Sequence, residues 1–417
     1  MAARSTAVKW FTYQHQGAPT LTGAAGSILE ILHACLVTGF GATPVDSITR
    51  DGSTVTVTIS AGHGFVEHQV VRISGCDQQE YNGDFRIDTV TNDTFTFELP
   101  DGVTPATPAT GTTLEAKAAP AGWERSFVSG DQLRAAFRST APEATGFYLY
   151  VDDTNAWPLR AGAKGYEMVT DIDTRSGPFP WSATDDQWVW WLKGWDVTTA
   201  RPWAVIADSR LFYVWVNADS SSKQYIYAFG DIIPFNTADV YGCVVAGHGS
   251  STDNNYCGGL LTITQVTRPA SGSYIARDIY GYYPGKRCCI SSVDLHITAP
   301  TYSKDSYPRA LGSWPTTFPC PTTKSVILSQ PILVEPFVDN RDPEQSGQGC
   351  VFRGNLPGLF APLHDRPYSD LSVVTDAVQV RPLLALKYLC SRWKFSYETS
   401  GPRQGQVMID ITGPWRE

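Results

Sequence analysis

Two histidines lie in glycine turns, Gly62-His63-Gly64 and Gly247-His248-Gly249, and cysteines flank the second turn. Imidazole and thiolate groups are the ligands that zinc prefers, so a site could be built from His248 with Cys243, Cys257 and Cys288. The spacing Cys-x4-His-x8-Cys matches no common zinc pattern, and paired short cysteine spacings are absent. We therefore expect both histidines in structural turns, and we expect no metal and no other cofactor.

Carboxylates also occur in patterns that could do chemistry. The adjacent pairs Asp152-Asp153 and Asp185-Asp186 could supply the acid and base of glycoside cleavage. Neighbouring residues of a strand point to opposite faces, so neither pair is itself a catalytic dyad, although distant carboxylates could still converge. Residues 171–177 resemble the start of a calcium loop, but the later glutamate is missing and Arg175 intrudes. An Asx turn is the expected role of that stretch.

Several function classes are disfavoured by the whole chain. It contains no G-x-S-x-G elbow, P-loop, H-E-x-x-H or dinucleotide fingerprint, so we expect no catalytic residues and a protein that is not an enzyme. The net charge is −9, and the basic residues do not cluster, which argues against a nucleic-acid partner. The longest apolar run, residues 28–37, is interrupted by Glu30 and His33, which argues against membrane insertion.

The densest aromatic cluster lies between residues 181 and 195. Trp188 and Trp190 are two residues apart, so a strand would place them on one face and Trp191 on the other. One face can belong to the core. The other can contact a partner protein or form a platform for a carbohydrate, because aromatic side chains are enriched at interfaces. We take all three tryptophans as candidate interface residues.

The segment Arg353–Pro367 combines many Gly and Pro residues with large apolar side chains. Pro removes a backbone donor and Gly permits positive φ, so the segment suits neither a helix nor a central strand. Leu356, Leu359, Phe360 and Leu363 need a surface that covers them, either in their own domain or in a neighbouring chain. We expect this segment to be a docking element.

The elements that must position these residues are mainly strands. The chain has 36 Gly, 28 Pro and 12% aromatic residues, which favours β-structure with many turns. One short N-terminal helix is expected within residues 18–37, with Thr22 as N-cap and Gly39 as terminator. The expected fold is mainly β, a multi-domain antiparallel β-sandwich or barrel architecture with long loops.

Four parts are expected along the chain. Residues 1–45 carry the helix and belong to the core domain, and 46–116 form an inserted small β-domain, with alternating strands such as 54–59 and 94–98. Residues 117–345 form the β-rich core domain. Residues 346–417 hold the docking segment, a strand or short helix over 378–388, and a closing hairpin of 394–397 with 406–411.

Several stretches resemble virion proteins of tailed bacteriophages and prophages. They are residues 17–27 with the apolar helix and Gly39-Phe40-Gly41, the motifs of 165–180, the segment Arg353–Pro367, and Thr412-Gly413-Pro414-Trp415-Arg416. Residues 46–116 resemble small β-domains that are inserted in phage tail and fibre proteins. These anchors cover most of the chain and carry no chemistry.

The resemblance implies a structural subunit of a virion, most plausibly in the tail or baseplate. It implies protein–protein contacts with other virion proteins, with Trp415 as a further interface candidate, and a homo-oligomer in a symmetric assembly. A host-surface glycan-binding tail protein and a head or neck decoration protein remain alternatives. Nine irregularly spaced cysteines fit buried thiols in a protein made in the bacterial cytoplasm and incorporated into the virion.

Overall fold

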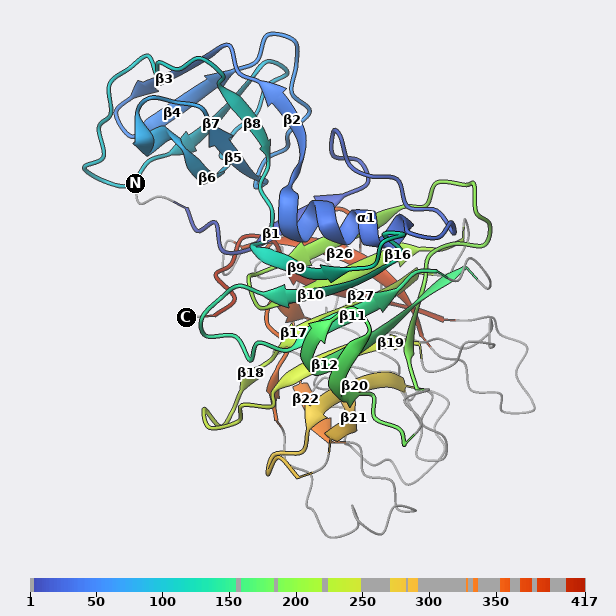
Figure 1. The fold of residues 1–417 in the computed structure, drawn as a ribbon. Helices are drawn as coiled ribbons and strands as arrows, with labels where there is room; N and C mark the ends of the chain where they lie inside the picture. The colour runs from blue at the N-terminus through green and yellow to red at the C-terminus, as the bar shows by residue number, and fades with distance from the viewer. Residues whose placement is uncertain are drawn as a thin grey trace, which may run out of the picture.

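The computed structural model describes residues 4–154, 159–183, 187–219, 224–248, 271–282, 284–291, 328, 333–336, 353–360, 368–376, 381–390 and 403–416. Its strands pair antiparallel in four sheets, so the expected mainly-β fold is confirmed (Figure 1). The largest sheet curls towards a half-barrel, and one short helix packs against it.

The helix is shorter than the sequence indicates. Helix α1 spans Ser27–His33, and one π-helical turn, η1, continues it over Ala34–Thr38. Gly26 precedes the helix with a φ of 83°, and the expected N-cap Thr22 instead accepts a hydrogen bond from the Ala24 amide within a turn. The expected end at Gly39 is confirmed, because the Gly39 amide closes the last turn on Ala34.

Residues between β2 and β8 form a unit with a hydrophobic cluster of its own. Alternating side chains such as Val55, Val57, Phe95 and Phe97 fill it, as expected for half-buried strands. Figure 1 shows the unit protruding beyond α1, although the exact domain boundaries stay a prediction. Its elements are β2 (Phe40–Pro44), β3 (Ser47–Asp51), β4 (Thr54–Thr58), β5 (Val70–Ser74), η2 (Gln79–Tyr81), β6 (Gly83–Arg86), β7 (Thr94–Glu98) and β8 (Glu115–Ala118).

The largest sheet has 16 strands and organises the rest of the molecule. They are β1 (Lys9–Thr12), β9 (Trp123–Val128), β10 (Arg134–Ser139), β11 (Tyr148–Asp152), β12 (Arg160–Asp171), β13 (Thr174–Phe179), β14 (Val189–Leu192), β15 (Trp203–Ala207), β16 (Leu211–Asn217), β17 (Gln224–Asp231), β18 (Ile233–Pro234), β19 (Cys243–His248), β20 (Ser271–Arg277), β21 (Pro284–Ser291), β22 (Leu333–Pro336) and β23 (Gly354–Asn355).

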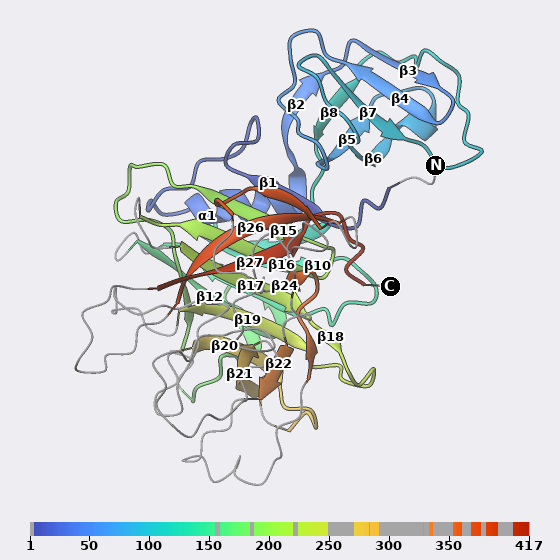
Figure 2. The same ribbon diagram turned by 180° about the vertical axis from the view of Figure 1, so that it is seen from behind.

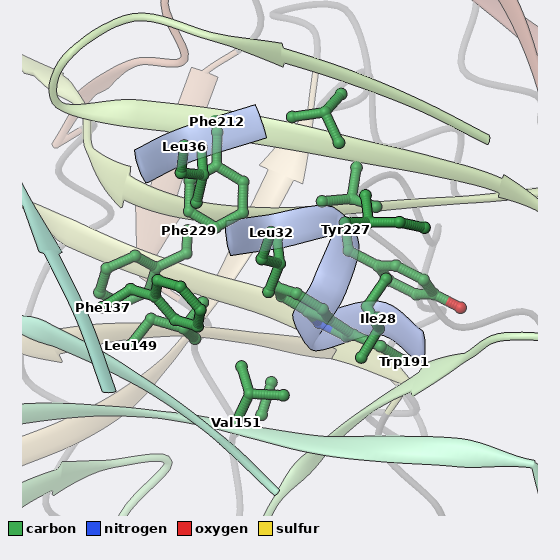
Figure 3. Close-up of a cluster of buried hydrophobic side chains, with 14 of the residues drawn as sticks. Ile28, Leu32, Leu36, Phe137, Leu149, Val151, Trp191, Phe212, Tyr227 and Phe229 are labelled. Carbon is green, nitrogen blue, oxygen red and sulfur yellow. The ribbon is translucent and has the colours of Figure 1, made fainter. Parts of the chain in front are cut away.

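The centre of this sheet is buried on both faces. In β16, Phe212 and Val214 belong to one hydrophobic cluster, while Tyr213 and Trp215 belong to a second. Figure 3 shows the first cluster, where Ile28, Leu32 and Leu36 of the helical segment point towards rings from the sheet such as Trp191, Phe212 and Phe229. Burial on both faces explains why these strands read as continuous apolar runs.

A smaller C-terminal sheet supplies the second cluster. Its strands run in the order β24 (Leu359–Phe360), β27 (Arg403–Asp410), β26 (Arg381–Cys390) and β25 (Val373–Asp376). The stretch 378–388, expected as strand or short helix, is strand where it is described. Of the expected closing hairpin, most of 406–411 lies in β27, which pairs with β26, and the expected partner 394–397 lies outside the described residues.

Candidate interaction surface

Trp190 and Trp191 of β14, with Trp188 directly before it, divide between the two faces of the sheet as the period-two pattern predicts. Trp191 is wholly buried, donates from its indole nitrogen to the Ala246 carbonyl at 3.0 Å, and stacks on Tyr227. Trp188 and Trp190 are half-buried on the opposite face. This corrects the assignment of Trp191 as an interface candidate, because its side chain is part of the core in this fold.

Trp188 lies flat against the neighbouring strand β12. A Cβ at Gly162 would lie 2.9 Å from Cε3 of the indole, so only glycine leaves room for the ring there. The Lys164 ammonium lies 4.7 Å from the ring centroid, and Lys164 is wholly buried whereas Trp188 is not. The ring therefore covers the lysine with one side, in a cation–π contact, and its exposed surface lies on the other.

Further rings and cations continue this face across β11 and β12. The Arg175 guanidinium lies 4.1 Å from the Tyr150 ring centroid and 5.4 Å from that of Tyr166. Tyr150 lies 6.0 Å from Trp188, and Trp190 lies 6.5 Å from Trp188, centroid to centroid. Burial raises the pKa of the Tyr150 phenol, which therefore stays protonated at neutral pH. Tyr150 and Tyr166 are wholly buried against Arg175 and Trp188, so the accessible part of this surface consists of Arg175, Trp188 and Trp190. We call these three residues the aromatic face.

The aromatic face can bind but has no reacting group of its own. Half-exposed rings offer stacking surfaces, and Arg175 offers donors from its planar fork. Such a combination suits the flat apolar side of a sugar ring beside its hydroxyls, or an apolar patch of a protein. Both alternatives that the sequence leaves open for Trp188 and Trp190 therefore remain.

The candidate carboxylate pair Asp152-Asp153 does point in two directions, as expected. Asp153 is fully buried, forms an ion pair with Lys193, and accepts a hydrogen bond from the Ile28 amide at 3.2 Å. Burial raises the pKa of Asp153 to about 6, and the attraction of Lys193 opposes that shift. Asp152 accepts from its neighbour Thr154. Asp153, directly after β11, thus caps α1, and the pair Asp185-Asp186 lies outside the described residues.

The histidine and calcium patterns have structural roles where the structure describes them. His63 accepts from the Phe65 amide through Nδ1 at 3.0 Å, which fixes its glycine turn. Asp171 accepts from the Asp173 amide at 2.8 Å, which confirms the expected Asx turn. His248, Cys243 and Cys288 are buried, and Cys257 lies outside the described residues. Among the residues described, no group of three or more potential ligands could hold a metal ion.

The docking segment docks on its own chain. Leu356 and Leu359 are wholly buried in the second cluster, and the Tyr213 hydroxyl donates to the Pro357 carbonyl at 2.7 Å. Strand β23 joins the large sheet and β24 joins the C-terminal sheet, so the segment bridges the two. As interface candidates, Leu356 and Leu359 are therefore corrected to core residues. Phe360 is half-buried, and Leu363 lies outside the described residues.

Trp415 is likewise a core residue. Its ring packs on Tyr213 with centroids 5.6 Å apart, and its indole nitrogen donates to the Asp410 carbonyl at 2.9 Å. Gly358 has a φ of 69°, and a Cβ there would lie 2.2 Å from the indole nitrogen. The glycine of one resembling motif thus accommodates the tryptophan of another, which corrects Trp415 as an interface candidate.

Comparisons with known proteins assign the chain to no family. No protein-family model matches it, and no curated protein matches it. Among solved structures it is similar to the phage phi92 endosialidase, with 13% sequence identity over 89% of this chain and 52% of that chain, and a TM-score of 0.17. The chain thus spans about half the length of that protein. So low a TM-score carries no argument about fold or activity, and the expectation that the chain is not an enzyme stays a prediction.

Sequence reasoning missed a second group of outward side chains. Phe235 and Val240 lie between β18 and β19, and Tyr280 and Tyr282 lie between β20 and β21, all of them exposed. The sequence contains a signal for them, since a stretch with three tyrosines around Gly281, at 280, 282 and 283, is unusual for a solvated turn. In the part of the chain that the structure describes, no helix is long and apolar enough to cross a membrane.

Proposed function

We propose that this chain is a structural subunit of a tailed-bacteriophage virion, in the tail or baseplate, that acts through protein–protein contacts. One observation carries the proposal: the sheets form a buried scaffold that has aromatic side chains on its outside and no free chemical group among the candidates described. Asp153 and His63, which sequence patterns offer for chemistry, are hydrogen-bonded within the scaffold. The motifs that resemble virion proteins, around Leu359 and Trp415, supply the bracing. Such a rigid frame suits repeated contacts in a symmetric assembly.

The test is to find and count the chain in purified particles. We expect mass spectrometry to detect it and a cryo-electron-microscopy reconstruction to place it at the distal tail in low copy number. Density on the capsid or neck, in high copy number, would move it to the decoration class. Absence from particles that carry their other structural proteins would refute the proposal.

A second candidate function is binding of a host-surface glycan by the aromatic face. The support is specific: Trp188 is held flat over Gly162 and Lys164 with one side outward, beside Trp190. The planar cation of this face is Arg175, which packs on Tyr150, the neighbour of Trp188, and can donate to hydroxyl oxygens.

A glycan array with purified protein tests this second function. We expect binding by the wild type and loss of at least tenfold in signal for the double variant Trp188→Ala, Trp190→Ala. Trp181→Ala is the matched control, because Trp181 is exposed but is not part of the aromatic face. Equal binding by the double variant, or loss in the control alone, would remove the aromatic face as the glycan site.

A further inference from the structure

Two loops at the end of the molecule away from the β2–β8 unit present large apolar side chains. Figures 1 and 2 show them below the curled sheet, one next to β18 and the other next to β21. The exposed fractions are 56% for Phe235, 61% for Val240, 65% for Tyr280 and 77% for Tyr282. We call these four residues the loop surface.

A buried ion pair holds the first loop. Arg353 forms a bidentate ion pair with Asp239, with both nitrogen–oxygen distances 2.7 Å and both side chains buried. The Arg353 carbonyl accepts from the Phe235 amide at 3.0 Å. The backbone of Phe235 and the side chain of Asp239, which precedes Val240, are thus bonded to Arg353. These bonds hold the loop in one conformation in the free chain.

A second arginine joins the two loops. Arg277 forms a bidentate ion pair with Glu167, donates to the Gly281 carbonyl at 2.8 Å, and lies 5.3 Å from the Tyr241 ring centroid. Tyr241 packs against Gly281, where a Cβ would lie 2.7 Å from the ring. The two loops therefore contact each other through Tyr241, which follows Val240, and Gly281, which lies between Tyr280 and Tyr282.

The turn that carries both tyrosines is built around Asp278. One carboxylate oxygen accepts from the amides of Tyr280 and Tyr282, at 3.1 and 2.8 Å. The other oxygen is buried without a hydrogen-bond partner among the described residues. The two bonds to Asp278 fix the backbone of the turn, and both tyrosine side chains are exposed on it.

The chemistry of the loop surface selects its partner. The four residues of the loop surface carry no charge. The charged groups beneath them are paired, Arg353 with Asp239 and Arg277 with Glu167, or buried, as the Asp278 carboxylate is, so the surface presents no charged side chain of its own to an ionic ligand. Phe235 and Val240 cannot hydrogen-bond the hydroxyls of a sugar, and of the four side chains only those of Tyr280 and Tyr282 could, so most of the surface is apolar. We propose that the loop surface is a docking site for an uncharged, apolar surface of a neighbouring virion protein.

The size of the loop surface agrees with that partner. Aromatic side chains can bury about 150–250 Å² each, so the exposed parts of the three aromatic residues together with Val240 offer on the order of 400–500 Å². This matches the largest apolar patch of typical monomers and about half of one side of a standard protein interface. Tyrosine and phenylalanine anchors on pre-formed loops lose little entropy on binding, which suits the centre of such an interface.

The inference rests on the proposed function, and incorporation into particles tests both separately. Val240→Asp and Tyr282→Asp place a charge on the loop surface, while Val197→Asp and Tyr13→Asp place one at exposed positions elsewhere, with exposed fractions of 47% and 41%. Each variant is supplied in the host strain in place of the wild type, and the chain is counted in purified particles. Melting temperatures of the purified variants check that each is folded.

We expect at least tenfold less chain per particle for the two loop variants and wild-type levels for the two controls. Normal incorporation of both loop variants would overturn the docking site and leave the proposed function standing, even if they lost glycan binding. Absence of the wild type from particles would instead overturn the proposed function and, with it, the docking site.

Hydroxyl-radical footprinting of the wild type avoids any effect of substitution on folding. Tyr280 and Tyr282 should be at least fivefold less oxidised in particles than in the free chain, while the exposed Met168 of the β12–β13 hairpin should be oxidised equally in both. Equal oxidation of the tyrosines in particles and free chain would overturn the docking site.

Discussion

Arg86 holds the β2–β8 unit to the rest of the chain, and its removal is the sharpest test of how the parts are joined. The side chain is buried, and its guanidinium donates only to backbone carbonyls in the bonds described. Burial lowers the pKa of Arg86 to about 10, with the charge of Asp410 opposing the shift. The five acceptors are the carbonyls of Ser5 (2.6 Å), Val8 (2.7 Å), His68 (2.6 Å), Ile411 (2.9 Å) and Thr412 (3.0 Å).

The expected magnitude follows from these five bonds. Arg86→Met leaves the carbonyls without their donor, and each buried acceptor left unsatisfied costs about 1–3 kcal/mol. Water will reach some of them, and the desolvation of the guanidinium is relieved, so we expect a net loss of about 3–5 kcal/mol, as for other broken buried charge contacts. Arg86→Lys keeps three donors and should lose about 1–3 kcal/mol.

Hydrogen exchange locates the effect, and urea unfolding measures it. Residues 46–116 contain no tryptophan, so tryptophan emission follows the remainder of the chain. In Arg86→Met, peptides covering 5–12 and 408–413 should exchange faster, and the peptide covering 54–58 should not change. Unchanged exchange in residues 5–12 and 408–413 would refute the role of Arg86 in holding these two segments to the β2–β8 unit. Faster exchange at 54–58 alone would instead make Arg86 a core residue of the β2–β8 unit.

Three further predictions concern the interior. Leu359→Ala should lower the free energy of unfolding by about 2–5 kcal/mol because Leu359 is wholly buried, and Phe360→Ala, half-buried, should lose less in the same urea titration. Arg353→Met should cost about 3–5 kcal/mol and the double variant with Asp239→Asn should recover part of it, which a double-mutant cycle measures. Asp153 has a raised pKa in the fold, so its contribution to stability should fall as pH rises from about 4 to about 6, and Asp153→Asn should remove that dependence from urea titrations across this range.

The sequence predicts well those strands whose pattern is local. The alternation over 54–58 and 94–98 fixes β4 and β7, and the tryptophan spacing fixes which face of β14 each ring takes. Helix α1 is predicted in kind but not in its start. Its first turn is capped by Asp153, a residue 125 positions away, and no pattern near Gly26 contains that information.

The burial of the docking segment could not be predicted from nearby residues either, because the residues that cover it are distant in sequence. Leu356 and Leu359 look like docking residues because Gly and Pro rule out a regular element around them. Their cover comes from β16, β26 and β27, strands that the chain places on both sides of the segment in sequence. Apolar residues in an irregular stretch show only that a cover exists; which surface supplies it depends on tertiary pairing.

The motifs around Leu359 and Trp415 that resemble virion proteins lie in the core, and this decides what the resemblance predicts. Leu359, Gly358 and Trp415 pack on one another or on the sheet core, so a change at any of them disturbs folding before it reaches a partner. Resemblance in these motifs therefore predicts a shared scaffold rather than a shared partner. The exposed residues of the loop surface can change at little cost to stability, so the identity of the partner has to be sought there, by experiments on residues such as Val240 and Tyr282.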